Sequence, residues 1–343
     1  MSPGYDFSVG IVGAGSIVRD AHLPVLAASA GLSPIWITDA DDARARQVAR
    51  SYGIRAVPAA EAPLGLPQAD IVLLAIPHGA REPYYDALRD RDVALYVEKP
   101  VAATVEEHRR IVDAFAPPHR VAHGLQRRSF GPTRLAQQLV DDGPLGALVS
   151  IDCGFGRPGG GRYAGFRADV RQAGGGILFE HGIHLLDSVL FLTRAAVASV
   201  RSARMAFEAG FDVHTEIDLD LRTSAGRAIP CSFRCSWLCE TETGIILRFE
   251  HAELAYSIYD STGKMRLSGR GSRSTYRVLP EWRDPLPLTA AQTLHDHWDH
   301  VARALRDRQA NYTSACESIL TTQIVESCYE RGRREAARLP ARP

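Results

Sequence analysis

The chain has 343 residues, which is too long for one ordinary hydrophobic core and suits two domains. It carries 40 basic and 40 acidic residues, and 45% of its residues are hydrophobic, so its composition is that of a soluble globular protein. The balanced charge favours neither nucleic acid nor an anionic membrane surface as a partner. The chain begins without a basic segment followed by an apolar one, and no apolar run reaches membrane-spanning length, so we expect a cytoplasmic location.

An apolar run, a glycine turn and a helical pattern follow one another near the start. Residues 8–12 have the composition of a strand that ends at Gly13, and the apolar spacing of a helix continues to Leu26. Gly13 allows a tight turn, and Gly15 lets the backbone approach a pyrophosphate held by the N–H groups of the new helix. Val18 stands where this fingerprint has a small residue. The residues predicted to contact a dinucleotide here are Gly13, Ala14, Gly15, Ser16 and Ile17.

A carboxylate ends the next apolar run. Residues 34–38 lead to Asp39, which lies 24 residues after Gly15. A carboxylate at this strand tip can accept hydrogen bonds from both hydroxyls of the adenosine ribose, and it would repel a 2′-phosphate. We therefore predict NAD rather than NADP as the cofactor. The alternative is that Asp39, with Asp41 and Asp42, only opens the following helix.

The alternation of strands and helices continues to about residue 124. The run at 71–76 is apolar throughout and is stopped by Pro77, as in a strand buried on both faces of a parallel sheet. This pattern predicts a doubly wound nucleotide-binding domain over residues 1–123, with its ligand beyond the carboxyl ends of the strands. Further strands are expected at 93–97 and 121–124, and helices at 43–52, 82–89 and 104–115.

Lys99 is one of only two lysines in a chain that otherwise uses arginine, and it stands in Glu98-Lys99-Pro100 after the apolar run 93–97. An arginine cannot exchange a proton in a protein, whereas burial can tune a lysine ammonium into a working acid or base. We therefore interpret Lys99 as a candidate catalytic residue at the crevice where the strand tips converge. The alternative is a lysine that only caps a strand end.

Beyond residue 124 the pattern changes to strands of alternating polarity, which predict an open, mostly antiparallel sheet. We expect these strands at 148–153, 197–207, 216–222, 231–238, 244–249 and 254–258, and helices at 132–140, 291–308 and 314–337. Residues 124–343 are thus predicted to form an α+β domain for substrate binding and oligomerisation, with C-terminal helices that pack back. The glycine-rich stretch 154–163 is long enough to act as a lid.

The six cysteines are expected to be reduced thiols. Cys231, Cys235 and Cys239 are spaced four residues apart. On a strand their Cα atoms would lie roughly 13 Å apart, at about 3.3 Å per residue, so they cannot share one metal ion. We expect no metal site.

A second group of chemically active side chains follows the three glycines at 174–176. The apolar spacing of residues 177–187 is helical and places Glu180, His184 and Asp187 on one face. A carboxylate beside an imidazole sets its tautomer and raises its basicity, as a proton-transfer site near neutral pH requires. A zinc site is disfavoured because no third His or Cys completes the ligand set. The other interpretation is a polar stripe packed against another helix.

Gly13-Ala14-Gly15, Glu98-Lys99-Pro100, and three glycines followed by an acid and a histidine four residues apart together resemble the Gfo/Idh/MocA family, named for glucose-fructose oxidoreductase, inositol dehydrogenase and a rhizopine catabolism protein. The resemblance covers nearly the whole chain. It implies an NAD-binding Rossmann domain and an α+β domain with an open sheet, assembled as a homodimer or homotetramer, that act on sugars, cyclitols or related polyols. It also implies that Lys99 and His184 contact the reacting hydroxyl or carbonyl, with Glu180 orienting them.

The predicted site extends beyond these motifs. Cofactor contacts are also expected from Asp39, Ile76, Pro77, His78, Glu98 and Lys99. Substrate contacts are expected from Lys99, Arg128, Phe155, Tyr163, Arg167, His181 and His184.

The chain departs from the family pattern at three places. Glu180 stands where the family usually has Asp, and its longer arm must move the carboxylate by roughly 1.5 Å. Ile76-Pro77-His78 stands where the family tends to have Thr-Pro-Asn. Arg81 stands four residues after Pro77, where the family tends to have His, and it serves a substrate group or, as we expect, caps a helix.

The sequence thus predicts an NAD-dependent oxidoreductase that transfers a hydride between the nicotinamide and a ring carbon of a sugar, cyclitol or aminoglycoside-type substrate. Two other functions remain open, a non-catalytic NAD-binding regulator that senses sugars and an NAD-dependent glycoside hydrolase. A cationic amino sugar would suit the acids of the expected sheet unless these are simply solvated. The acids are Glu216, Asp218, Asp220, Glu240 and Glu242.

Overall fold

The structure is a computed structural model that describes residues 6–159, 169–223, 226–269, 272–277 and 286–336. The chain divides into two compact units, each assembled from two separate stretches. The first unit comprises Met1–Gln126 and Leu294–Ile319, and the second comprises Arg127–Thr293 and Leu320–Pro343.

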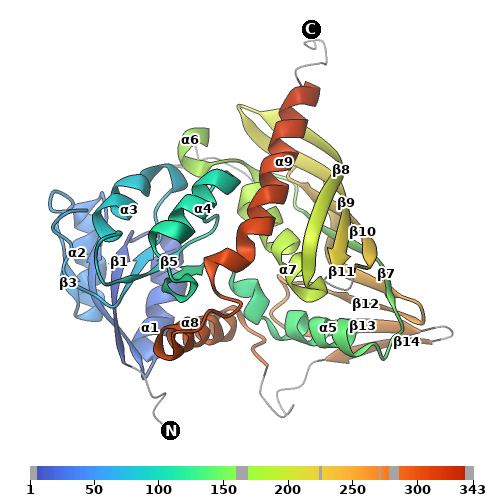
Figure 1. Cartoon of the computed structure of the whole chain (residues 1–343), viewed down its shortest axis with the longest axis horizontal. Helices are drawn as coiled ribbons and strands as arrows, with labels where there is room; N and C mark the ends of the chain where they lie inside the picture. The colour runs from blue at the N-terminus through green and yellow to red at the C-terminus, as the bar shows by residue number, and fades with distance from the viewer. Residues whose placement is uncertain (1–5, 160–168, 224–225, 270–271, 278–285, 337–343) are drawn as a thin grey trace. The chain divides into compact units, whose positions relative to one another are not determined.

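A parallel sheet forms the centre of the first unit. Its strands are β1 (Phe7–Val12), β2 (Leu32–Thr38), β3 (Arg55–Ala56), β4 (Ile71–Leu74), β5 (Ala94–Val97) and β6 (Val121–His123). They lie in the order β3-β2-β1-β4-β5-β6, and every pairing is parallel (Figure 1). The direction of winding reverses between β1 and β4, which is where doubly wound sheets bind dinucleotides. The predicted Rossmann fold is therefore confirmed.

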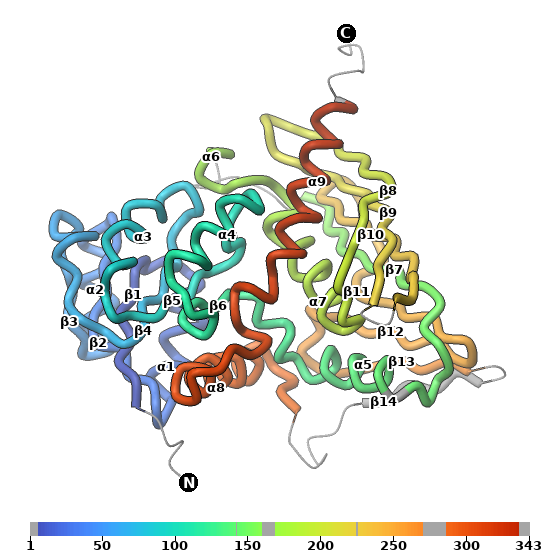
Figure 2. The backbone as a smooth tube through the Cα atoms, viewed as in Figure 1, coloured from blue at the N-terminus to red at the C-terminus, as the bar shows by residue number. Residues whose placement is uncertain are grey.

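Helices cover both faces of this sheet, as the fully buried strands β4 and β5 require. One apolar core joins Ile11 of β1 to Leu23 and Trp298, and the other joins Val72 of β4 to Ile111. The helical segments are η1 (Val18–His22), α1 (Leu23–Ala28), α2 (Asp42–Tyr52), η2 (His78–Ala80), α3 (Glu82–Leu88), α4 (Val105–Ala114), η3 (Pro118–Arg120), α8 (Ala290–Asp307) and η7 (Ala315–Ser318). From Leu294 onward α8 belongs to this unit and runs beside α1, although the two are far apart in sequence (Figure 2).

Local signals set the bounds of these helices. Asp41 caps α2 by accepting a hydrogen bond from the Arg44 amide at 3.1 Å. Thr104 caps α4 in the same way through the Glu107 amide at 3.2 Å. The helices predicted at 43–52 and 104–115 are confirmed to within one residue at each end.

A larger, open sheet forms the second unit. Its strands are β7 (Leu148–Gly156), β8 (Ala195–Glu208), β9 (Phe211–Thr223), β10 (Ala228–Ser236), β11 (Thr241–Phe249), β12 (Ala252–Tyr256), β13 (Lys264–Gly269) and β14 (Ser272–Arg277). Their order is β14-β13-β12-β11-β7-β10-β9-β8. All pairings are antiparallel except that of β7 with β10. The predicted open, mostly antiparallel sheet is confirmed.

One face of this sheet is covered and the other is open. Along β10, Ile229, Cys231 and Phe233 are buried, whereas Ser232 and Arg234 between and after them are exposed. The covered face packs on the central helical segments η6 and α7, which contact β7, β8, β10 and β11. The helical segments of this unit are η4 (Gln126–Ser129), α5 (Gly131–Asp142), α6 (Val170–Ala173), η6 (Leu178–Gly182), α7 (Ile183–Thr193) and α9 (Ile319–Ala336).

The most apolar helical stretch is a core element. Among the described residues, Val170–Thr193 is the one stretch long and apolar enough to cross a membrane, with a mean hydropathy of 1.2. Because 83% of that window is buried inside the protein, it has the character of the central helix of a soluble fold.

Candidate functional site

The glycine turn after β1 forms a cradle at the switch point. Gly13 has φ +106°, and a Cβ added there would lie 2.4 Å from the carbonyl oxygen of Ala75, so the turn and the tip of β4 can approach this closely only with glycine. A Cβ added at Gly15 would meet nothing within 4 Å, so the backbone there faces open space. No side chain caps the helical segment that begins after Ile17. Open space beside uncapped backbone N–H groups fits the pyrophosphate of a dinucleotide.

Asp39 is fixed at the mouth of this cradle. Its Oδ2 accepts a hydrogen bond from the Ala14 amide at 2.6 Å, and its Oδ1 accepts one from the Asp41 amide at 2.8 Å. The carboxylate thus ties the tip of β2 to the glycine turn. Because a carboxylate offers about four acceptor positions, these two bonds leave room for ribose hydroxyls.

Arg44 is a residue that the sequence analysis missed. Its Nη1 lies 3.5 Å from Oδ1 of Asp39, and its side chain is 45% exposed. An arginine beside the ribose-binding acid is the group that accommodates a 2′-phosphate in NADP-dependent relatives of this fold. Its position in the first turn after the strand tip was the only sequence signal for it.

Glu98 lies at the tip of β5 in a buried network. Its Oε1 is 2.9 Å from Nε2 of His22, which is fully buried at the end of η1. The indole N–H of Trp298 donates to Nδ1 of His22 at 3.1 Å, so the His22 proton lies on Nε2 and points at Glu98. Burial acts to raise the pKa of Glu98, but the His22 hydrogen bond and the charges of Lys99 and Arg81 outweigh it and lower that pKa. Glu98 is therefore held as a carboxylate.

The loops at the tips of β4 and β5 are joined to each other. Arg81 is buried and donates to the carbonyl oxygens of Ile76, at 3.1 Å, and Pro100. Arg81 occupies the N-cap position of α3, as the helix-cap interpretation expects, but its side chain makes no capping hydrogen bond and does not face solvent. His78 lies 3.4 Å from Glu107, and burial lowers its pKa. Lys99 is half-buried, and its amide donates to Glu98 Oε2 at 3.1 Å.

In the second unit, the glycine triplet leads into the helical segment that carries the predicted catalytic residues. Asp212 of β9 anchors it, because its carboxylate accepts hydrogen bonds from the amides of Gly176, at 2.6 Å, and Leu178, at 2.9 Å. Tyr329 of α9 donates to the same carboxylate. A Cβ added at Gly176 would lie 2.1 Å from the carbonyl oxygen of Asp212, so only glycine fits there. Burial raises the pKa of Asp212 against these hydrogen bonds.

Glu180 and His181 lie in a π-helical turn, η6, and His184 lies in the first turn of α7. The apolar spacing predicts one continuous helix over residues 177–187 and gives no sign of this wider turn. Such π-turns often occur at functional sites. Glu180 and His181 are half-buried, and His184 is 8% exposed.

Asp187 does not serve as a second acid for His184. It is fully buried, and its two carboxylate oxygens accept hydrogen bonds from Arg128 at 2.8 and 2.6 Å. Thr321 of α9 also donates to Asp187, at 2.9 Å. Arg128, a predicted substrate contact, is thus placed in a buried ion pair that fixes α7.

An aromatic cluster surrounds His181. The ring of Phe155 stacks on the His181 ring with centroids 4.3 Å apart, and the Tyr259 ring lies 4.9 Å from that of Phe155. The Tyr259 hydroxyl donates to the His181 carbonyl at 2.9 Å. Phe155 and His181 were predicted substrate contacts. Two others, Tyr163 and Arg167, lie outside the described residues, as does part of the predicted lid.

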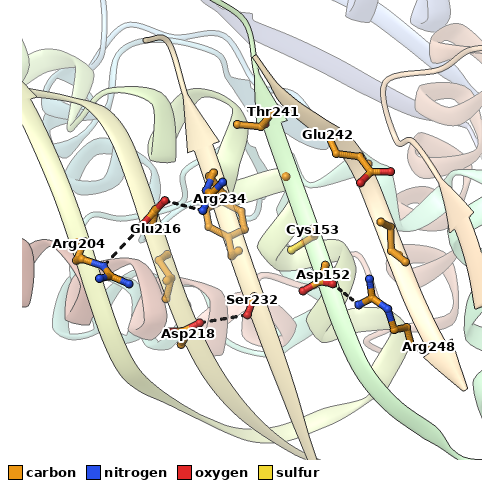
Figure 3. Close-up of a pocket in the computed structure, with 15 residues that line it drawn as sticks. Asp152, Cys153, Arg204, Glu216, Asp218, Ser232, Arg234, Thr241, Glu242 and Arg248 are labelled. Atoms are coloured by element: carbon orange, nitrogen blue, oxygen red, sulfur yellow. Dashed lines mark hydrogen bonds and ion pairs between the residues drawn. The ribbon is translucent and has the colours of Figure 1, made fainter. Parts of the chain in front are cut away.

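Most of the acids expected on the open face of the second sheet are bonded to that face's own residues. Figure 3 shows Glu216 between Arg204 and Arg234, at 3.6 and 2.8 Å. Asp218 accepts from Ser202 and Ser232. Of these groups, all but Ser202 line a depression of about 350 Å³. Because the acidic charge is largely matched, this face offers little attraction to a cationic amino sugar. In the described part of the chain no cluster of side chains could hold a metal ion.

A doubly wound sheet with a phosphate cradle and an acid at the second strand tip, followed by an α+β unit, is the architecture of a two-domain dinucleotide-binding protein. The family model described as "Oxidoreductase family, NAD-binding Rossmann fold" matches residues 7–123. The model of the GFO/IDH/MocA C-terminal domain matches residues 133–266. The chain therefore belongs to the Gfo/Idh/MocA family, and NAD is the cofactor of its first unit.

Known proteins with related sequences act on sugars and cyclitols. The chain is 29% identical over 196 residues to dTDP-3,4-didehydro-2,6-dideoxy-alpha-D-glucose 3-reductase of Streptomyces antibioticus. The aligned part covers 53% of this chain and 55% of that protein. It is 30% identical over 147 residues to inositol 2-dehydrogenase 3 of Saccharopolyspora erythraea, covering 42% and 44% of the two chains. The chain thus spans about half the length of the curated relatives it matches.

The fold is also that of a solved enzyme. A levoglucosan dehydrogenase in complex with NADH and levoglucosan superposes with a TM-score of 0.82 over 96% of this chain and 98% of that one. The two chains are 16% identical, so this likeness concerns the fold alone.

Proposed function

We propose that the protein is an NAD-dependent oxidoreductase that interconverts a hydroxyl and a ketone on a ring carbon of a sugar, cyclitol or aminoglycoside-type substrate. The observation that carries the proposal is the tip of β5. There a buried carboxylate, Glu98, is locked by His22, and the next residue is one of only two lysines in the chain, Lys99. When bound, NAD supplies the acceptor for the hydride.

The residues of the chain manage the proton. An alcohol has a pKa of about 16, so at neutral pH its proton leaves only when a positioned cation and a base share it in the transition state. Lys99 and His184 fill these roles. Glu180 precedes His184 by four residues and orients its imidazole.

The remaining site residues bind and orient. Cofactor contacts are assigned to Gly13, Ala14, Gly15, Ser16, Ile17, Asp39, Ile76, Pro77, His78, Glu98 and Lys99. Substrate contacts are assigned to Lys99, Phe155, Tyr163, Arg167, His181 and His184, whereas Arg128 is assigned a positioning role. Asp187 takes up the guanidinium of Arg128, so Arg128 acts on the substrate through the position of α7.

We also propose a cytoplasmic protein that assembles as a homodimer or homotetramer through the open face of the second sheet. That face is the one that η6 and α7 leave uncovered, so a second copy can pack against it.

A screen for NAD reduction with sugars, cyclitols and aminoglycosides tests the proposal, and the Lys99→Arg variant sharpens it. Arginine keeps the charge but cannot exchange the proton, so turnover should fall by about two to four orders of magnitude while NAD affinity changes little. Lys264→Arg alters the only other lysine, which is exposed, and should have no effect.

Two results would contradict the proposal. Full turnover in Lys99→Arg would remove the lysine from the chemistry. Binding of NAD with no oxidation of any substrate would indicate a regulator, whereas release of an aglycone without net NADH would indicate a glycoside hydrolase.

A further inference from the structure

Arg127 is a largely buried cation that has no counter-ion among the residues that the structure describes. It lies in η4, next to Arg128, whose guanidinium is paired with Asp187. The Nε of Arg127 is buried and has no hydrogen-bond partner, and among the described residues no carboxylate forms an ion pair with its guanidinium. Its guanidinium carbon lies 5.8 Å from the centroid of the Tyr259 ring. Of the two adjacent arginines, Arg128 is thus paired with a carboxylate and Arg127 has none among the described residues.

An unpaired guanidinium in such a place costs free energy. Burial lowers the pKa of Arg127, and Tyr259 is the one neighbour that acts to raise it. A guanidinium nevertheless stays charged in a protein, so it cannot escape the cost by losing its proton. Buried charges are normally paired, and a protein retains an unpaired one where a ligand completes the pair.

The surroundings of Arg127 connect it to the proposed catalytic segment. The Tyr259 ring that faces the guanidinium donates its hydroxyl to the carbonyl of His181. His181 follows Glu180 directly and stacks on Phe155. One aromatic residue therefore separates Arg127 from the π-turn that carries Glu180.

We propose that Arg127 binds an oxyanion, a carboxylate or a phosphate, that is part of the substrate. The proposal rests on the proposed function, because it takes the anion bound by Arg127 to be part of the compound that is oxidised or reduced. A guanidinium offers a planar fork of N–H donors that matches the two oxygens of a carboxylate or phosphate. The substrate is then an acidic sugar derivative, such as a sugar acid, a sugar phosphate or a nucleotide-linked sugar, and not a neutral sugar or a cationic aminoglycoside.

Matched substrates and variants test this assignment. D-glucose is compared with D-glucuronate, which adds a carboxylate, and with glucose 1-phosphate and UDP-glucose, which add phosphate. For the wild-type protein, at least one acidic form should have a KM about 10- to 100-fold below that of glucose, as expected for hydrogen bonds to a charged group. Arg127→Met should abolish this preference, and Arg127→Lys should retain part of it. Arg227→Met, an exposed arginine of the same unit, should retain it fully.

Thermal unfolding gives a readout that does not require activity. Removal of an unpaired buried charge should leave the ligand-free protein at least as stable, so Arg127→Met should unfold at the wild-type temperature or above it. The acidic sugar should raise the unfolding temperature of the wild-type protein but not that of Arg127→Met. A marked loss of stability in ligand-free Arg127→Met would show a structural role and overturn the proposal.

The two proposals can fail separately. Equal KM and equal stabilisation by neutral and acidic sugars would overturn the assignment of Arg127 while leaving the oxidoreductase intact. Weaker NAD binding in Arg127→Met would also overturn it, because the anion would then belong to the cofactor. Arg127-dependent stabilisation by an acidic sugar that is never oxidised or reduced would instead contradict the proposed function.

Discussion

His22 donates its Nε2 proton to Glu98 across 2.9 Å, and this bond joins the helical turn that follows the phosphate cradle to the strand tip that precedes Lys99. Trp298 sets its direction by donating to the other ring nitrogen of His22. The ring of Trp298 stacks on Tyr96 at 4.3 Å, so the donor itself is fixed by packing. The position of Lys99 therefore depends on a residue nearly 200 positions later in the chain.

Replacement of His22 tests this network. His22→Phe keeps a ring of similar shape but leaves the buried Glu98 carboxylate without its main donor, so we expect a loss of about 3 kcal/mol in the free energy of unfolding. NAD affinity should fall as well. Trp298→Phe keeps the stacking ring and loses one neutral hydrogen bond, so it should cost only about 1 kcal/mol. Urea unfolding and NAD titration measure both effects, and equal stability of His22→Phe and the wild type would contradict the role of the bond.

The pair of Asp39 and Arg44 predicts how cofactor preference can be changed. Asp39→Ser removes an acceptor for the ribose hydroxyls and the repulsion of a 2′-phosphate, and Arg44, which keeps Asp41 as its other partner at 3.1 Å, can meet that phosphate. The ratio of kcat/KM for NADP to that for NAD should rise by about 10- to 100-fold. In the double variant Asp39→Ser/Arg44→Ala the gain for NADP should disappear. If the double variant gains as much as the single one, Arg44 has no part in the preference.

Glu180 should affect the pH dependence of the reaction. Glu180→Gln keeps the size and hydrogen-bonding reach of the side chain but removes the charge that supports a protonated His184. The rising limb of the pH–rate profile should shift to lower pH, and NAD affinity should stay unchanged. Stopped-flow measurement of NADH formation from pH 5 to 10 tests this expectation. An unaltered profile would assign Glu180 a structural role.

Asp212 should determine the position of the segment that carries Glu180 and His184. Asp212→Asn puts an N–H donor against the amides of Gly176 or Leu178, so it should cost about 3 kcal/mol of unfolding free energy and lower kcat. Tyr329→Phe removes only one donor and should cost about 1 kcal/mol. Because the first unit is unaffected, NAD affinity should remain at the wild-type value in both variants. A normal kcat in Asp212→Asn would contradict this role.

His108 should make the first unit sensitive to acid. Burial lowers the pKa of His108 from 6.5 to about 4, and its Nε2 lies 3.0 Å from the Ala315 carbonyl oxygen. Between these values the unfolded chain binds a proton that the folded protein does not. The contribution of neutral His108 to the free energy of unfolding is therefore fully present above about pH 6.5, and it is lost as the pH falls toward 4. The free energy of unfolding should be about 2 kcal/mol lower at pH 5 than at pH 7 on account of this residue.

The matched variants for this prediction are His108→Gln and His295→Gln. Glutamine at 108 can still donate to Ala315 but does not titrate, so this part of the pH dependence should disappear. His295 is 46% exposed, and its replacement should leave the pH dependence unchanged. Urea unfolding at pH 5 and 7 decides between the two outcomes.

The sequence predicted the parts of the fold that local patterns specify. The apolar run of β4 shows in its own sequence that both faces of the strand are buried. Asp41 and Thr104 likewise mark the starts of their helices, so the Rossmann sheet and its helices could be predicted. The pairing of Asp212 with Tyr329 could not be predicted, because 117 residues separate the two and nothing near either one identifies the other.

Two local features could not be predicted either, namely the π-turn of η6 and the different surroundings of Arg127 and Arg128. An apolar spacing of three and four residues fits an α-helix, and the single wider turn at Leu178–Gly182 changes that spacing too little to be recognised. Arg127 and Arg128 are adjacent and chemically identical. Only the position of Asp187 shows that Arg128 is the paired one.

The division of the chain into two units affects how the protein is made. The apolar face over β1 is completed by Leu294, Trp298 and Val301, which a ribosome adds only after the whole second sheet. Until residues 294–319 have been synthesised, that apolar face of the N-terminal unit stays uncovered. The N-terminal unit therefore cannot finish folding before the second unit has been made. Mutations late in the gene, within the codons for 294–319, should therefore impair nucleotide binding.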